Sequence, residues 1–265
     1  NVDAQLGDMF DVQFNAAGII ADSNYPSGQT YATQYGGYSL ENQMLYSAPY
    51  IPKVYQSSDP DDPNNGMPTS GFRNIGHNPE YAAGHSGFSK SRRVTINTSG
   101  RIDWKAPFLK GLKASFFFSW DWYDLQSKSF NYTYKVMAWN PSTKQYSKLD
   151  APNLTPGGNM VVGDQKGQKT VVRPSISYTG TFNSVHNVNA IFLYERTNDD
   201  SSVMSGNRRN FALYDLPYLS FGQDLDPDPN KANSESAGKS ASEGIAGRVG
   251  YNYDEKYLAE VAFRY

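Results

Sequence analysis

The stretch Leu112-Lys-Ala-Ser-Phe-Phe-Phe-Ser-Trp-Asp-Trp122 has apolar residues at every even position and mostly polar residues at the odd positions. A period of two indicates a pleated strand with two unlike faces. At about 3.4 Å per residue and a tilt near 45°, a strand of about eleven residues rises roughly 26 Å, close to the apolar band of an outer-membrane barrel. The stretch therefore predicts a strand with one face toward hydrocarbon and the other toward water.

The same alternation predicts six further strands. In the strand that precedes it, Ile96, Ile102 and Trp104 have one parity, whereas Arg101 and Asp103 have the other. We expect all seven strands to be antiparallel neighbours, at residues 9–20, 93–104, 112–122, 170–182, 187–196, 244–253 and 257–265.

The predicted connections alternate strictly between short and long. The short ones, at 105–111, 183–186 and 254–256, contain Pro, Gly, Asn or Asp, as tight turns require. The long ones, at 21–91, 123–169 and 197–243, are polar and rich in Pro and Gly. Outer-membrane barrels have short periplasmic turns and long extracellular loops, so we expect the chain to start at the periplasmic side and run outward first.

Composition agrees with this interpretation. Hydrophobic residues make up 38% of the chain and the mean hydropathy is -0.64, and no run approaches the roughly 20 apolar residues that a membrane helix needs. Many aromatic residues lie at strand ends, as interfacial belts require. The net charge of -2 gives no indication of nucleic-acid binding. The absence of cysteine carries little weight, and any targeting segment is expected to lie outside this chain.

The predicted fold class is therefore all-β, with antiparallel strands that form part of a large transmembrane β-barrel. Single-chain bacterial barrels have even strand numbers from eight upward, and an open sheet edge is not viable in lipid. Seven strands are about a third of the wall of a barrel of roughly 22 strands. We expect residues 1–265 to be one partial barrel segment, with the remaining wall supplied from elsewhere.

The last hairpin, Gly247-Arg-Val-Gly-Tyr-Asn-Tyr-Asp-Glu-Lys-Tyr-Leu-Ala-Glu-Val-Ala-Phe-Arg-Tyr265, resembles a hairpin of SusC/RagA-like TonB-dependent transporters. Further segments resemble the same family in the same order, at 78–87, 107–121, 177–182 and 186–195. The resemblance covers most of residues 78–265. The first 77 residues are similar to the family only in having a strand followed by a long loop. The family's plug domain, its TonB-contact segment and its other strands have no counterpart here.

Some residues depart from the pattern. Pro174 lies inside a predicted strand and cannot donate to the ladder, which predicts a bulge or a shifted register nearby. Phe117, Ile191 and Leu193 fall on the polar, lumen-facing side. We expect these three side chains to contact a plug domain or an inward-folded loop.

The charges of the last hairpin make a separate prediction. With a turn at 254–256, Arg248 lies opposite Ala262, and Glu260 lies diagonal to Arg248 and two residues from Arg264. Long side chains reach such diagonal positions. We expect a charge network on the lumen face.

Motifs for chemistry are scarce. His77, His85 and His186 have no metal-ligand spacing with another ligand type. The segment 163–170 lacks the spacing of a phosphate-binding loop, and 84–87 is not a nucleophile elbow. We expect no enzymatic activity and no cofactor.

Two acidic loops, at 59–65 and 224–230, are candidate metal-binding loops. The second has oxygen ligands at alternate positions, as calcium loops do, but Pro229 stands where an EF-hand needs Gly and no bidentate Glu follows. We favour a solvated loop, and a structural calcium ion is the alternative.

Two function classes remain. The first, which the resemblance implies, is TonB-energised import of an oligosaccharide, or less readily an oligopeptide, with a SusD-like surface lipoprotein as partner. The second is a secreted β-rich glycan-binding or enzymatic domain. The asymmetry of turns and loops favours transport, because it has no rationale in a soluble sandwich. The candidate solute or partner contacts are loop aromatics, which also commonly pack loops together: Trp139, Tyr146, Tyr214 and Tyr218.

Overall fold

The computed structural model describes the chain except residues 28–43, 46, 72–77, 133, 151–157 and 224–232. Two sequence predictions, a non-ligand role for His77 and the calcium alternative at 224–230, lie outside the described residues. Among the described helices, none combines the length and the apolar run that crossing a membrane would need.

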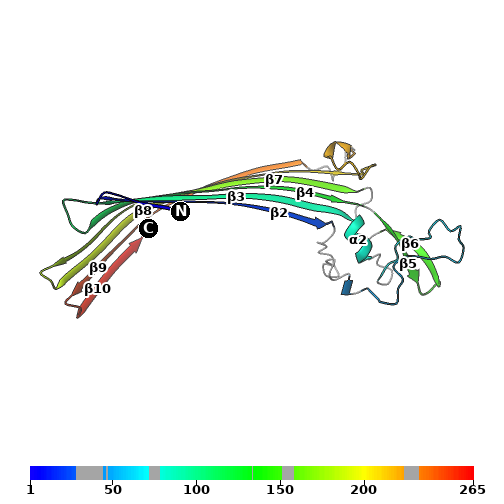
Figure 1. Ribbon diagram of the computed structural model, residues 1–265, viewed down its shortest axis with the longest axis horizontal. Coiled ribbons are helices and arrows are strands. Elements are labelled where there is room, and N and C mark those ends of the chain that lie inside the picture. The colour runs from blue at the N-terminus through cyan, green and yellow to red at the C-terminus, as the bar shows by residue number, and fades with distance from the viewer. Residues whose placement is uncertain (28–43, 46, 72–77, 133, 151–157, 224–232) are drawn as a thin grey trace.

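The all-β prediction is confirmed, because one antiparallel sheet of eight strands dominates the structure (Figure 1). Its strands follow the order β1-β2-β3-β4-β7-β8-β9-β10, so every neighbour in the sheet is also the next of these strands along the chain. The bounds are β1 Val2–Leu6, β2 Phe10–Pro26, β3 Gly87–Lys105, β4 Leu112–Asn131, β7 Asn159–Phe182, β8 His186–Arg209, β9 Asn233–Tyr253 and β10 Tyr257–Arg264.

The strand count and the strand lengths differ from the sequence prediction. A short strand, β1, precedes the seven expected ones and pairs with the start of β2, so the chain first runs toward the turns rather than outward. Several strands continue well into the predicted loops, so that the long connections shrink to 27–86, 132–158 and 210–232. Alternation of apolar and polar residues stops where the bilayer would end, but backbone pairing does not.

The long connections contain their own elements. A separate two-stranded sheet, β5 (Lys135–Asn140) with β6 (Gln145–Asp150), lies between β4 and β7. A short helix, α2 (Pro79–His85), precedes β3, and a 3-10 turn, η1 (Leu219–Phe221), lies between β8 and β9. Figure 1 shows all of these at one end of the sheet, and the short turns at the other.

The register through the main sheet is regular, which corrects the prediction for Pro174. Between β7 and β8, Val172 pairs with Arg196 and Ser175 with Leu193, so the ladder keeps one register across the two unpaired positions between them. On the other side Pro174 pairs with Phe116 without interruption. The missing N–H of proline removes local pairing and produces neither a bulge nor a slip.

Turn chemistry closes the short connections. In the β7–β8 turn Asn183 and Ser184 both have positive φ, and Val185 N–H donates to the Phe182 carbonyl at 3.2 Å. The β9–β10 turn repeats this at Asp254 and Glu255. Two consecutive left-handed residues give the twist that matches the flanking strands.

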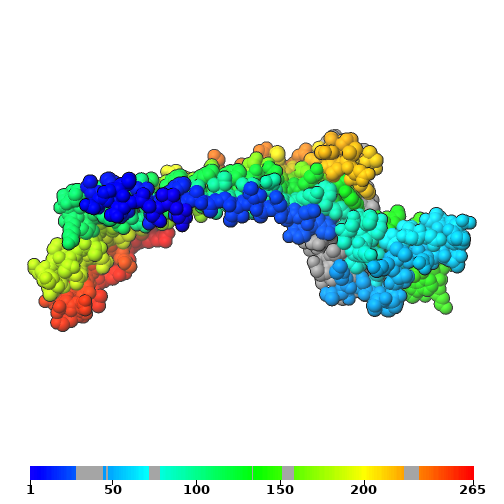
Figure 2. All heavy atoms as spheres, in the orientation of Figure 1, coloured from blue at the N-terminus to red at the C-terminus, as the bar shows by residue number. Residues whose placement is uncertain are grey.

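The sheet is a single curved layer with open edges. Figure 2 shows a narrow strip with β2 along one edge. The buried hydrophobic residues of the described chain lie almost entirely at the loop end, in a cluster of Phe130, Met160 and Phe211 and around Val136–Ala138. Among the described residues, none forms a second layer packed against the middle of the sheet.

Candidate functional site

The convex face of the sheet is apolar over its middle. Because the register is regular, the even residues of β2, β3, β4, β7 and β8 share one face with the odd residues of β9 and β10. Side chains on this face remain exposed although they are large and apolar: Phe116 is 46% exposed, Ile176 47% and Phe192 46%. An uncovered apolar face of this extent requires a nonaqueous partner.

An aromatic belt borders this face at its turn end, and two tryptophans of β4, Trp120 and Trp122, lie at its other border. At the turn end, ring contacts follow the sheet: Trp104 with Phe108 at 6.1 Å, Tyr178 with Phe182 at 6.3 Å, and Tyr253 with Tyr257 at 6.4 Å. At the other border Trp120 Nε1 donates to Gln168 Oε1 at 3.3 Å, and Gln168 Nε2 donates to Asp200 at 3.2 Å. Directly beyond this border the same parity carries polar and charged residues such as Asp124, Lys166 and Ser202, and apolar side chains return only near the loop end.

The concave face is polar and rich in ion pairs. Lys105 lies 2.7 Å from Asp11, Arg101 lies 2.9 Å from Asp103, and Arg173 Nε donates to Glu195 at 2.6 Å. Phe117, Ile191 and Leu193 do lie on this face, as the sequence predicts. The guanidinium of Arg173 lies over the Phe117 ring at 5.3 Å.

Of the charge network predicted in the last hairpin, the contact between Arg248 and Glu260 is confirmed, and the part at Arg264 stays a prediction. Arg248 pairs with Ala262 across β9 and β10, and its guanidinium lies 3.9 Å from the Glu260 carboxylate on the concave side. Both side chains are more than half exposed, so the ion pair contributes little stability. Its main significance is that it identifies the concave face as the solvent-facing one.

The β5–β6 hairpin and the preceding loop form one module at the loop end. Met137 N–H donates to the Pro68 carbonyl at 2.8 Å, and Thr69 forms a parallel bridge with Met137. The Trp139 and Tyr146 rings pair across the hairpin at 5.1 Å, and Tyr55 packs on Tyr146 at 5.0 Å. Trp139 is still 44% exposed.

The other two predicted aromatics lie elsewhere, on the convex side. Tyr214 stacks on Tyr132 at 5.0 Å and takes part in the cluster around Phe130. Tyr218 is 59% exposed, with the Lys128 ammonium 5.1 Å from its ring centre. The structure therefore brings Trp139 together with Tyr146 on the β5–β6 hairpin, whereas Tyr214 and Tyr218 belong to the separate segment around η1.

The remaining polar candidates have local partners. His85 stacks on Tyr81 at 4.0 Å, and His186 Nδ1 lies 2.6 Å from the Tyr251 hydroxyl. In the loop at 59–65, Asp62 accepts the Asn64 N–H at 2.9 Å, and this backbone hydrogen bond lowers the pKa of Asp62. Within the described part of the chain, no three acidic or histidine side chains are grouped to hold a metal ion.

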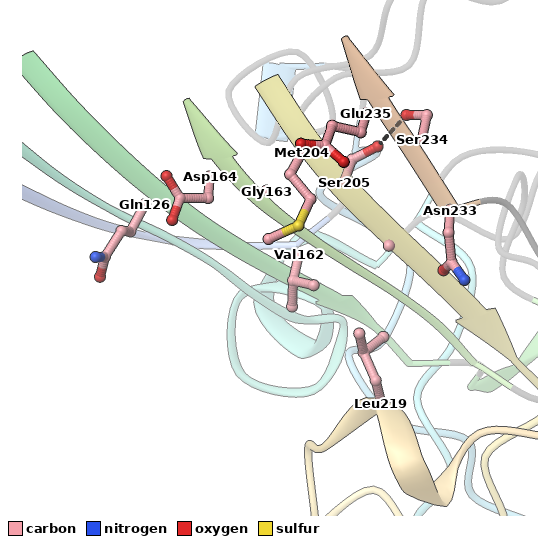
Figure 3. Close-up of a pocket in the computed structure, with 11 residues that line it drawn as sticks. Gln126, Val162, Gly163, Asp164, Met204, Ser205, Leu219, Asn233, Ser234 and Glu235 are labelled. Atoms are coloured by element: carbon pink, nitrogen blue, oxygen red, sulfur yellow. Dashed lines mark hydrogen bonds between the residues drawn. The ribbon is translucent and has the colours of Figure 1, made fainter. Parts of the chain in front are cut away.

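Sequence reasoning missed a groove on the convex face beyond the apolar band. It has a volume of about 620 Å³ and lies between the sheet and η1 (Figure 3). Val162, Met204 and Leu219 give it an apolar lining, and Asp164 and Glu235 lie on either side of Met204. Leu219 comes from a loop, so no periodic pattern could have placed it there.

Comparisons with known proteins bear on the fold. No protein-family model and no curated protein matches the chain. Among solved structures, it is similar to the RagAB peptide importer in the "closed-closed" state, with a TM-score of 0.63, and in the "open-open" state, with 0.64. A third structure, of the RagAB peptide transporter, gives a TM-score of 0.65. In each case the identity is 16%, over 99% of this chain and 26% of that chain. The likeness shows a shared fold over a quarter of the larger chain.

Proposed function

We propose that this chain forms part of the wall and extracellular rim of an energy-coupled outer-membrane importer of oligomeric nutrients. The observation that carries the proposal is the contrast between the two faces of one long sheet. The convex face is apolar between an aromatic belt at the turn end and the tryptophans of β4, and the concave face is lined with ion pairs such as Arg173 with Glu195. Lipid on one side and water on the other account for both faces.

The proposed energy coupling follows from the size of the barrel to which this sheet would belong. A sheet with two open edges needs further strands to close in lipid, and the solved neighbours support a large barrel. Barrels of about 22 strands have a plugged lumen. In this proposal a plug, supplied outside residues 1–265, is moved by work from a TonB complex, and the apolar lumen residues Phe117, Ile191 and Leu193 contact it.

The rim is proposed to meet a SusD-like surface lipoprotein and the solute. The β5–β6 module and the segment 210–223 around η1, called the η1 segment, project from the loop end of the sheet. Functional loops on a rigid scaffold are placed in this way. The solute is an oligosaccharide or an oligopeptide. The solved neighbours are described as peptide importers, which supports the peptide, whereas the half-exposed Trp139 supports stacking on a sugar. No chemistry is performed on the solute.

A secreted glycan-binding domain is the alternative. It would leave the apolar convex face in water, because no second layer of this chain covers that face in the described residues. Exposed apolar patches of this kind aggregate unless they meet a partner.

The test is uptake by cells that carry the full-length protein. Uptake of labelled oligopeptides and of labelled oligosaccharides is measured in two kinds of cell. One carries a deletion of residues 212–221, and the other lacks TonB energy. We expect loss of energy to abolish uptake of one of the two solutes, and the deletion to weaken uptake or lipoprotein association while the barrel still assembles. A Trp139→Ala variant tests stacking, with Lys144→Ala as its control on the same hairpin. Uptake that survives both treatments would contradict the proposal.

A further inference from the structure

The convex face carries a cationic patch just beyond the apolar band. Lys90 on β3 pairs directly with Lys128 on β4, and Arg92 lies two residues before the Val94 end of the apolar run. These even residues share the face of the lipid-directed side chains. The Lys128 ammonium lies 5.1 Å from the ring of Tyr218, which immediately precedes η1 on the convex side, so the lysine also points to that side.

The two lysines are not neutralised by the described part of the chain. The contact found for Lys90 is the Phe88 ring at 4.9 Å, and that for Lys128 is Tyr218. The nearest acids on this face are paired elsewhere: Asp22 lies 3.7 Å from Arg92, and Asp164, diagonal to Lys128, lies 3.2 Å from Lys166. Like charges directly opposite each other destabilise a sheet. An unfavourable pair at this position is explained if an anion binds between the two ammonium groups.

The surface around the lysines is hollowed. An open groove of about 520 Å³ is lined by Asp22, Lys90, Arg92, Gln126, Lys128 and Val162, together with neighbouring small polar residues. Its depth along the strands is that of a headgroup layer: Arg92 and Lys90 lie roughly 5 and 10 Å beyond Val94 for a tilted strand. Lysine side chains also reach toward the membrane surface with their charged ends.

We propose that Lys90, Lys128 and Arg92 bind the phosphate-bearing headgroup of an outer-leaflet lipid. The inference rests on the proposed function, since it needs lipid on the convex face. A phosphate monoester carries close to two negative charges and three acceptor oxygens, which match two ammonium groups and a partly paired guanidinium. The lipid chains then lie along the apolar band below, against Val94 and Trp122.

The experiment uses the full-length protein in phosphatidylcholine bilayers with and without phosphatidic acid. The variant is Lys90→Gln with Lys128→Gln, and the matched control is Lys144→Gln with Lys148→Gln on the β5–β6 module, which removes the same charge. Bound lipid is counted by native mass spectrometry, and the unfolding temperature is measured in parallel.

We expect phosphatidic acid to raise the unfolding temperature of the wild type and the control but not of the variant, whose affinity falls about thirtyfold. Without phosphatidic acid the variant is as stable as the wild type or more so, because the repulsion between the lysines is gone. Inorganic phosphate at the same concentration gives no protection, since it lacks the chains.

Four results would overturn the inference. The first is that the variant retains phosphatidic acid as the wild type does, and the second is that inorganic phosphate raises the unfolding temperature equally. The third is that the variant keeps lipid but loses a co-purifying protein, which makes the patch a protein contact. The fourth is that no version of the protein inserts into phosphatidylcholine. The last result alone contradicts the proposed function as well.

Discussion

At the scale of single residues, the side of the sheet decides what a substitution costs. Phe116 lies in the middle of the exposed apolar face, whereas its neighbour Ser115 lies on the polar face, where it pairs with Asp103 across the strands. We expect Phe116→Arg to lower the stability of the folded barrel by about 2–4 kcal/mol, because a charge near the bilayer midplane loses its hydration. Ser115→Arg is tolerated. Unfolding of the full-length protein in lipid measures both, and equal costs would contradict the assignment of the faces.

Gly111 is a residue whose backbone permits no side chain. It has a φ of +93°, and an added Cβ would lie 1.9 Å from the Thr179 carbonyl oxygen across the β4–β7 pair. We expect Gly111→Ala to cost at least about 2 kcal/mol, from left-handed strain and from the shift that the contact forces on β7. Gly18→Ala is the control, because nothing lies within 4 Å of its added Cβ. Similar melting curves for the two variants would argue against this turn geometry.

At the scale of elements, the acidic loop at 59–65 is stabilised by a carboxylate. The Asn64 N–H is the first cause of the lowered pKa of Asp62, and the Tyr55 hydroxyl donates to the same side chain at 3.2 Å. A folded pKa below the usual value means that this contribution is present above the usual pKa and is lost as pH falls through the lowered one. We expect hydrogen exchange at Asn64 to accelerate, relative to the intrinsic rate, in that acidic window. Asp62→Asn should remove the pH dependence, and exchange that stays pH-dependent in this variant would assign it to another group.

The segment 210–223 around η1 packs on the sheet through a buried aromatic cluster, in which Phe211 is its buried ring. Phe211 is 4% exposed and contacts Phe130 at 4.7 Å, edge to face. Phe211→Ala should cost about 3–5 kcal/mol of local stability, because it leaves a cavity beside Met160. We expect faster proteolysis within 210–223 while the strands stay protected. Leu213→Ala, at an exposed position, should change neither. Cooperative unfolding of the whole sheet in Phe211→Ala would show that the segment is not a separate unit.

At the scale of the whole molecule, the proposed function requires that the membrane cover only part of the length of the strands. The chain has no cysteine, so single cysteines report cleanly. On the convex side of β4, we expect Ala114→Cys and Phe116→Cys to resist a charged maleimide, and Asp124→Cys and Gln126→Cys to react. The boundary at Trp122 follows from the apolar band of about 25 Å. Uniform labelling from residue 114 to 126 would mean that no bilayer covers this face.

The sequence by itself determined the faces of the strands. Alternation at 112–122 assigns each side chain to the apolar face or to the polar face. In a single-layer sheet this assignment is a local property of the pleat. Turn residues such as Asn183 and Asp254 likewise fix the hairpins locally. The register that places Arg248 near Glu260 followed from one turn position. The candidate aromatics were found by type alone, and their type did not reveal that Tyr214 is held by Tyr132.

Only the tertiary structure decided how far the strands extend and what covers their ends. Beyond Trp122 polar residues occur on both faces of β4, so alternation fails, while cross-strand hydrogen bonds continue to Asn131 and need no side-chain pattern. Strand β1 is too short for its period to be recognised. The pairing of Lys90 with Lys128 requires that this ladder continue past the alternating stretch. Leu219 and Val162 line one groove although they are far apart in the chain. That arrangement depends on the path of the loop, which local residue patterns do not encode.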